Sequence, residues 1–167
     1  MTTTTITNTT FEVISRFGFA DVLRNPSTNQ KSLHAAVNFV PGQVISKFYA
    51  ATTQACATYL TIQTGIETHI TLEPEFLQYT NHSCAPSVFF DTTAMQLICL
   101  RALKPGAEFT FFYPSTEWEM SQPFVCNCKT PECLQLINGA AHLDPSTLNK
   151  YRLTDFIKQQ SERKQSL

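Results

Sequence analysis

Three cysteines near the C-terminal end of the chain constrain its fold more than any other feature. Cys126, Cys128 and Cys133 fall within eight residues, and a Cys-x-Cys step is too tight for easy disulfide geometry. Thiolates at this spacing are typical of a shared metal ion. Counted together with Cys84, they would supply the four ligands of a tetrahedral site. The sequence therefore predicts one structural zinc ion that ties distant parts of the chain together.

Length and charge narrow the class of protein. The 167 residues suit a single domain with a real core. Twelve Lys and Arg against 13 Asp and Glu give a formal charge of -1 without a basic cluster before the tail, which argues against direct nucleic-acid binding. No apolar run reaches the length of a membrane span, and the Thr-rich residues 1–10 lack the features of a signal peptide. We expect an intracellular protein, cytoplasmic or nuclear, with reduced thiols and no membrane contact.

Short β-branched and aromatic stretches between polar turns predict a mainly β chain, with a meander over residues 11–49 after a flexible N-terminus at residues 1–10. Strands are expected over residues 11–23 with a break near Gly18, 33–40, 43–49, 58–72 with a hairpin at Gly65, 87–91, 95–100 and 109–113. Residues 74–79 suit a single helical turn. Residues 144–160 predict the one convincing helix, which Asp144 or Ser146 could cap.

Three blocks of sequence carry a family resemblance. They are Asn81-His82-Ser83-Cys84-x-Pro86, the stretch RALKPGAEFTFFY that ends at Tyr113, and the C-x-C-x4-C cluster. In this order they resemble the core of SET-domain proteins that carry a post-SET zinc segment, over roughly residues 30–139. The resemblance implies several small curved β-sheets, with a knot-like crossing where the chain near Tyr113 threads beneath the loop near Asn81. It divides the chain into a SET domain at 11–125, a post-SET zinc segment at 126–139, and a C-terminal helix and tail at 140–167.

The resemblance implies methyl transfer from S-adenosylmethionine to a lysine side chain. Tyr113 falls on the position where the cofactor and the amine meet, and its phenol would orient the amine there. The positions that hold the cofactor in the family correspond to Lys31, Ser32, Leu33, Asn81 and His82. Trp118 is a candidate for packing on the adenine, or equally an aromatic plug at the edge of a small core.

The resemblance also assigns a substrate pocket and the metal ligands. The pocket would include Tyr49, Phe90 and Phe111, and phenylalanine at the last two positions leaves room for di- or trimethylation; ordinary core packing would also explain both. The zinc ligands would be Cys84, Cys126, Cys128 and Cys133. The remaining cysteines, Cys56 and Cys99, lie in strand-like surroundings and are expected in the core.

Two departures from the family pattern leave three functional hypotheses open. Gln30 and Ser32 stand where the family usually has glycines, which lack a Cβ and permit positive φ beside the cofactor. The insert that shapes a peptide groove, within residues 50–76, is short. The chain could methylate a protein or peptide lysine. It could instead use the fold for small-molecule, natural-product chemistry, either methylation or cyclisation in an enclosed pocket. It could also be an inactive binding protein that keeps the fold.

Overall fold

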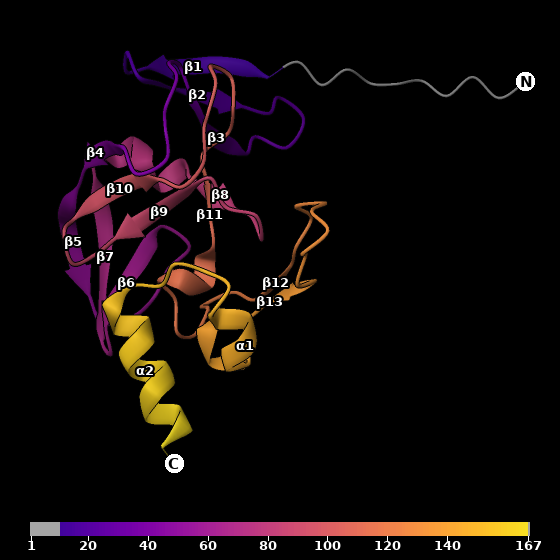
Figure 1. The fold of residues 1–167 in the computed structure, drawn as a ribbon. Helices are drawn as coiled ribbons and strands as arrows, with labels where there is room; N and C mark the ends of the chain where they lie inside the picture. Colours follow the sequence, from indigo (N-terminus) through magenta and orange to yellow (C-terminus); the bar gives the residue numbers. More distant parts are fainter. Residues whose placement is uncertain (1–10, 167) are drawn as a thin grey trace, which may run out of the picture.

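The computed structural model describes residues 11–166, so the flexible segment expected at residues 1–10 lies outside the described part of the chain. The chain is mainly β, as predicted, with five small sheets and short helical segments gathered toward the C-terminus (Figure 1). Within residues 11–166, no helix is long and apolar enough to cross a membrane.

The N-terminal sheet follows chain order. Its antiparallel strands are β1 (Glu12–Arg16), β2 (Ala20–Arg24) and β3 (Lys31–Ala35). Gly18 adopts φ +79° in the turn between the first two, which confirms the predicted break. The strand expected over 33–40 ends at Ala35, because the chain then leaves the sheet and forms an isolated bridge between Phe39 and Leu103.

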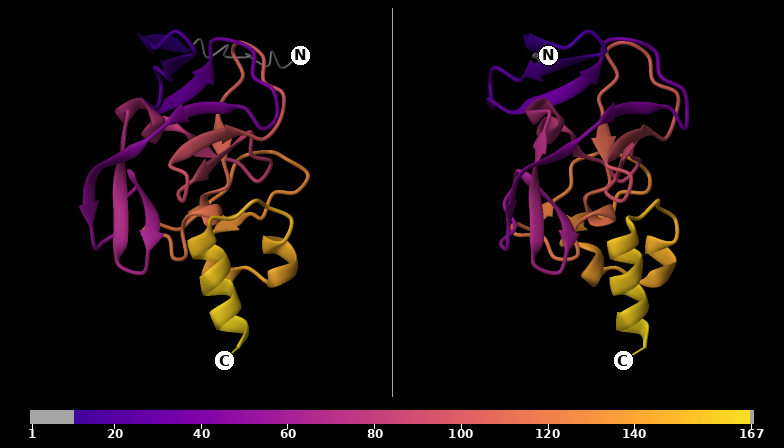
Figure 2. Two further views of the ribbon diagram at one scale, coloured as in Figure 1. Left: turned by 60° about the vertical axis from the view of Figure 1, so that its left-hand side comes forward. Right: turned by 90° about the vertical axis from the view of Figure 1, so that its left-hand side faces the viewer.

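Two further sheets bring distant segments together, so a simple meander is wrong for residues 43–49. The first orders β4 (Val44–Lys47), β10 (Gln96–Cys99) and β9 (Val88–Asp91); the second orders β5 (Tyr49–Gln54), β7 (Thr68–Glu73) and β6 (Thr61–Gly65). The strand expected over 43–49 is two strands in different sheets, separated at the buried Phe48. The expected hairpin at Gly65 is present as β6 and β7, and this sheet stands at one side of the molecule (Figure 2).

A short parallel pair joins the segment at Asn81 to the segment that leads into Tyr113. It consists of β8 (Asn81–His82) and β11 (Thr110–Phe111). The expected strand over 109–113 stops at Phe111, and a 3-10 turn, η2 (Tyr113–Ser115), follows because Pro114 has no N–H to donate to a ladder. Asn81 and Tyr113 therefore lie on neighbouring segments; the threading of one beneath the other stays a prediction.

The C-terminal region contains two separate helices where one was predicted. Its elements are the paired strands β12 (Phe124–Val125) and β13 (Leu136–Ile137), the turn η3 (Ala140–His142), and the helices α1 (Pro145–Leu148) and α2 (Asp155–Gln165). Asp144 caps α1, as predicted, by accepting a hydrogen bond from the Thr147 N–H at 2.9 Å. Thr154 caps α2 by accepting a hydrogen bond from the Ile157 N–H. The second helix therefore begins after the buried Leu153.

The main core lies between the first three sheets. Phe48, Phe90 and Phe109 are fully buried in it, with aliphatic residues from β2, β3, β7 and the helical turn η1 (Glu75–Tyr79), which was predicted at 74–79. A smaller cluster joins Trp118 to Leu148 and Ile157 of the C-terminal helices.

Tyr151 attaches the C-terminal region to the rest of the protein. Its ring stacks on Phe112 with centroids 3.6 Å apart and an interplanar angle of 8°. Its hydroxyl donates to the Cys84 carbonyl at 3.0 Å. This side chain therefore bridges the loop after β8 and the segment before η2.

Candidate active site and metal centre

The four predicted ligand cysteines come together. The Sγ atoms of Cys84, Cys126, Cys128 and Cys133 all lie within 4.8 Å of one another. The Cys84 and Cys126 sulfurs are 3.9 Å apart, which matches the roughly 3.8 Å edge of a tetrahedron with Zn–S bonds of about 2.3 Å and is far too long for a disulfide. The donor set could hold a zinc ion. Cys99 is buried as expected, whereas Cys56 is exposed, because it lies in the turn region between β5 and β6.

The pKa values of the cluster thiols are shifted in both directions. Burial raises the pKa of Cys84 and brings that of Cys126 to about 11. Burial also acts to raise the pKa of Cys128, but hydrogen bonds, first that with the Thr130 hydroxyl, bring it to about 6. Four crowded thiols cannot all ionise without a compensating positive charge, and a divalent metal supplies that charge.

His82 connects the cysteine cluster to Tyr113. Its Nδ1 accepts a hydrogen bond from the Tyr113 N–H at 3.2 Å, so the ring proton lies on Nε2, 3.4 Å from the Cys84 sulfur. Burial lowers the pKa of His82 to about 4, so the ring is neutral at physiological pH. Such an outer N–H contact to a ligand sulfur orients the ligand and strengthens a metal site.

Tyr113 stands in a row of aromatic rings. Its centroid lies 4.7 Å from Phe111, 5.1 Å from His82 and 5.9 Å from Phe124, and Phe111 lies 4.8 Å from Phe90. Burial, together with the charges of two nearby glutamates, raises the pKa of Tyr113 to about 12. The phenol therefore stays protonated at neutral pH and can act as a hydrogen-bond donor.

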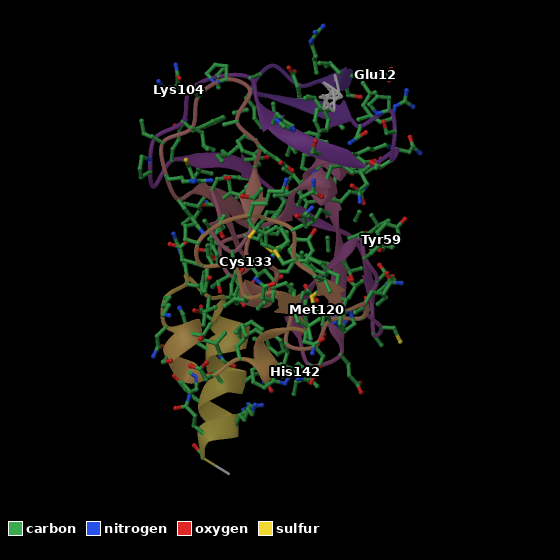
Figure 3. The ribbon with its side chains drawn as sticks, turned by 90° about the vertical axis from the view of Figure 1, so that its right-hand side faces the viewer. Glu12, Tyr59, Lys104, Met120, Cys133 and His142 are labelled. Atoms are coloured by element: carbon green, nitrogen blue, oxygen red, sulfur yellow. The ribbon has the colours of Figure 1, made fainter. Side chains whose placement is uncertain are left out.

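A cavity of about 1010 Å³ opens around this row. Its walls come from β6, η1, the β8–β11 pair and the segment from Met120 to Cys128. Tyr59 and Met120, both lining residues, and Cys133 of the four-cysteine cluster lie across the face of the molecule shown in Figure 3. The volume is at the upper end of the range for small-molecule sites, so a cofactor and an acceptor group would fit together.

The structure brings most predicted site residues to this cavity. Those that line it are Lys31, Asn81, His82, Phe90, Phe111, Tyr113, Cys126 and Cys128. Six others do not line it, and two of these, Cys84 and Cys133, belong to the four-cysteine cluster. Tyr49 is 61% exposed on β5, Ser32 and Leu33 are buried residues of β3, and Trp118 packs in the small C-terminal core. This place corresponds to the alternative of an aromatic plug at the edge of a small core. The backbone N–H of Trp118 donates a hydrogen bond to the Gln63 side chain, which fixes this part of the chain.

Asn81 organises the wall next to β3. Its side-chain N–H groups donate to the Lys31 carbonyl at 3.2 Å and to Glu108 Oε1 at 2.9 Å. The Lys31 ammonium donates to the Tyr79 hydroxyl and lies 4.6 Å from the centre of that ring. Lys31 is the only Lys or Arg among the described residues that line the cavity.

The altered loop before β3 has a physical explanation. The positive φ that a glycine would provide occurs at Asn29, with φ +60°, one residue before Gln30. Asparagine tolerates this left-handed conformation better than most residues do. Ser32 is buried and its hydroxyl lies 2.9 Å from His34 Nε2. Gln30 and Ser32 therefore fit the loop without a left-handed backbone of their own.

Sequence reasoning missed Glu117, the one buried acid of the cavity wall. Burial raises its pKa to about 7, although hydrogen bonds from the Gln63 N–H and the Thr116 hydroxyl act to lower it. No local pattern could have found it, because the hydrogen bond that holds its carboxylate comes from Gln63, 54 positions away.

Comparison with known proteins finds a relative over most of this length. A protein of Aspergillus flavus named methyltransferase flvH is 38% identical over 139 residues, which make up 82% of this chain and 78% of that protein. No protein-family model matches the chain.

Proposed function

The chain belongs to the same protein family as methyltransferase flvH, and from this premise we propose that it is a SET-type, S-adenosylmethionine-dependent methyltransferase that acts on a lysine amine. The observation that carries the proposal is Tyr113, a protonated phenol in the middle of an aromatic row that crosses one large cavity. Bound S-adenosylmethionine would supply an electrophilic methyl group on a positively charged sulfur. The aromatic rings offer faces that attract such cations.

The part of the cavity next to β3 suits the cofactor. The Lys31 ammonium would pair with a carboxylate of the cofactor, and Asn81 and His82 would frame it from the β8–β11 pair. Ser32 and Leu33 support this wall from behind rather than touch a ligand. Tyr113 would then direct its O–H toward the place where the amine nitrogen and the methyl carbon meet.

The opposite end of the aromatic row suits the acceptor. Phe90 and Phe111 present apolar rings without a hydroxyl, so they neither fix a water nor crowd a nitrogen that already carries a methyl group. We expect di- or trimethylated products for this reason.

Zinc would act as a structural closure. Cys126 and Cys128 line the cavity, so a metal at the four-cysteine set would hold residues 126–139 against the domain at 11–125. A closed set of four thiolates leaves no open position for chemistry on the metal.

A second candidate, a small-molecule amine acceptor, is favoured by the edge of β6. A bound peptide commonly adds a strand to a free sheet edge through backbone hydrogen bonds. On β6, the Thr61 N–H already bonds the Thr58 carbonyl and the Gln63 N–H bonds the Glu117 carboxylate. These two N–H groups are therefore not available to pair with a peptide strand. A small-molecule amine, which needs no backbone pairing to accept a methyl group, fits the cavity for this reason.

Calorimetry with S-adenosylmethionine on the zinc-loaded protein tests the proposal. We expect saturable binding, and transfer of labelled methyl groups either to short lysine peptides or to free primary amines, which separates the two candidates. Absence of cofactor binding would refute the proposed function.

Tyr113→Phe then tests the proposed role of the phenol. We expect methyl transfer to fall about 10²-fold or more, as for the loss of one oriented donor, with cofactor affinity nearly unchanged. Tyr49→Phe makes the same change at a tyrosine outside the cavity and controls for it. Full activity of the Tyr113 variant would remove the phenol from the mechanism.

A further inference from the structure

Glu117 lies on the same turn of chain as Tyr113. Its N–H donates to the Tyr113 carbonyl at 3.0 Å, immediately after η2. Its Oε1 accepts two hydrogen bonds, from the Gln63 N–H at 2.9 Å and from the Thr116 hydroxyl at 3.0 Å. The residue is 6% exposed and is one of the residues that line the cavity. The carboxyl group is therefore firmly held, with one oxygen fully used.

The second oxygen of Glu117 is free to meet a ligand. No group in residues 11–166 donates a hydrogen bond to its Oε2. The other two cavity glutamates also accept only through Oε1, Glu75 from Gln78 and Tyr79 and Glu108 from Asn81, so burial is what sets Glu117 apart. Both are also more exposed than Glu117. A carboxylate that is almost wholly removed from water is costly to ionise unless a donor, such as a cation, approaches it.

The surroundings of Glu117 hold its geometry. The Gln63 side chain donates to the carbonyls of Gly65 and Ile66 and accepts from the Trp118 N–H at 2.9 Å. The backbone of Gln63 thus bonds the Glu117 carboxylate, and its side chain bonds the backbone of the next residue, Trp118. A ligand would meet a carboxylate that needs no reorganisation.

We propose that Glu117 is the residue that selects an amine acceptor: its free Oε2 binds the substrate ammonium beside Tyr113 and then takes one proton from it. In this step an N–H bond breaks and an O–H bond forms on Glu117. The bonding electrons stay on nitrogen as the lone pair that a methyl acceptor needs. The inference rests on the proposed function and names the acceptor-binding group of that same cavity.

The acid–base properties of the cavity agree with this role. Burial raises the pKa of Glu117 to about 7, close to the value that suits a general base at neutral pH. With a pKa of about 12 for Tyr113 and about 4 for His82, neither changes charge between pH 6 and pH 8. The remaining ionisable groups that face the cavity are Lys31, Tyr59, Glu75, Tyr79, Glu108 and the metal-cluster thiols of Cys126 and Cys128.

Calorimetric binding of n-butylamine to the zinc-loaded, cofactor-free protein tests the inference. This probe carries the alkyl ammonium of a lysine side chain and stays charged below about pH 10. We expect its affinity to rise about tenfold from pH 6 to pH 8, because the ionised fraction of a carboxyl with a pKa near 7 rises by that factor. At pH 7, binding should release about half a proton, measured in buffers of different ionisation heat.

Glu117→Gln is the decisive variant. The glutamine can still accept from Gln63 and Thr116, and retained zinc content will show that it folds. We expect n-butylamine binding to fall at least tenfold and to lose its pH dependence. The matched controls Glu75→Gln and Glu108→Gln, which remove the other two cavity carboxylates, should retain the pH dependence. Neutral n-butanol should bind the wild-type protein and the Glu117 variant alike.

Two results would overturn the inference. One is wild-type binding of n-butylamine that is flat between pH 6 and pH 8 and releases no proton. The other is loss of the pH dependence in a control variant while Glu117→Gln keeps it. Either result would show that Glu117 does not bind the amine acceptor. If cofactor binding and methyl transfer were normal in the same protein, the proposed function would still stand. A protein that binds n-butylamine as expected but not S-adenosylmethionine would instead refute the proposed function.

Discussion

Gly139 is the position where a single methyl group should damage the protein most clearly. It has φ +110° and ψ 168°, a conformation that is essentially restricted to glycine. A Cβ built there would lie 2.5 Å from the Trp118 carbonyl oxygen and 2.9 Å from the Glu119 Cα. Both are backbone atoms and cannot swing aside as a flexible side chain could. The Ala140 N–H also donates to the Glu117 carbonyl, so this contact supports the cavity wall.

The expected cost of Gly139→Ala follows from these contacts. The backbone conformation should cost about 1–3 kcal/mol and the overlap a further ~1–3 kcal/mol. Alanine also reduces the conformational entropy of the unfolded chain, which stabilises the folded protein by about 0.4–1 kcal/mol. We therefore expect a loss of roughly 2–5 kcal/mol in the free energy of unfolding.

Gly42→Ala is the matched control. Gly42 also has positive φ, +84°, but a Cβ there would meet no atom within 4 Å. The left-handed backbone conformation alone should destabilise this variant, by about 1–2 kcal/mol. The reduced conformational entropy of its unfolded chain offsets part of that loss, as in the Gly139 variant.

Urea denaturation of the zinc-saturated proteins, followed by the fluorescence of the single tryptophan, Trp118, measures both losses. Equal losses for the two variants would refute the argument from close contact. A folded Gly139 variant should also bind n-butylamine more weakly. The reason is that a shift at residue 139 displaces the Ala140 N–H, which donates to the Glu117 carbonyl.

Two further predictions concern the metal centre and the buried acid. Cys128→Ser should lose the single zinc ion and become protease-sensitive beyond residue 125, whereas Cys56→Ser, at an exposed cysteine outside the cluster, should keep it; unchanged metal content in the first variant would contradict the assignment. The pKa of Glu117 rises on folding from 4.5 to about 7, so its destabilising contribution is absent below pH 4.5 and grows as pH rises to 7. Glu117→Gln should therefore gain roughly 3 kcal/mol relative to wild type between pH 4 and pH 8, and a difference in unfolding free energy that stays constant with pH would contradict this.

The sequence predicts those parts of the site that depend on local spacing. Cys126, Cys128 and Cys133 fall close together in any compact fold, and their chemistry limits what they can bind. Tyr113 and Asn81 were predicted from short motifs, and the parallel pairing of β8 with β11 does bring their segments together. Gly18 and Gly65 marked turns because glycine breaks regular strands there.

The remaining features depend on contacts that no local pattern encodes. The bond between Glu117 and Gln63 joins residues 54 positions apart, so nothing beside Glu117 in the sequence announces its burial. The same tertiary contact carries Trp118 into the C-terminal core and away from the cavity. Phe48 divides an apparently continuous strand because its side chain is needed in the core between two sheets.

Under the proposed function, the position of His82 would give a metal at the cysteine cluster an influence on catalysis without any role in the chemistry. One ring nitrogen faces a ligand sulfur and the other holds the backbone of Tyr113. Whatever changes that sulfur, whether loss of zinc or oxidation of the cluster, would withdraw the partner of one nitrogen and loosen the other. Under the proposed function, the activity of this enzyme would respond to zinc supply and oxidative stress in its surroundings, although neither reaches the reacting atoms.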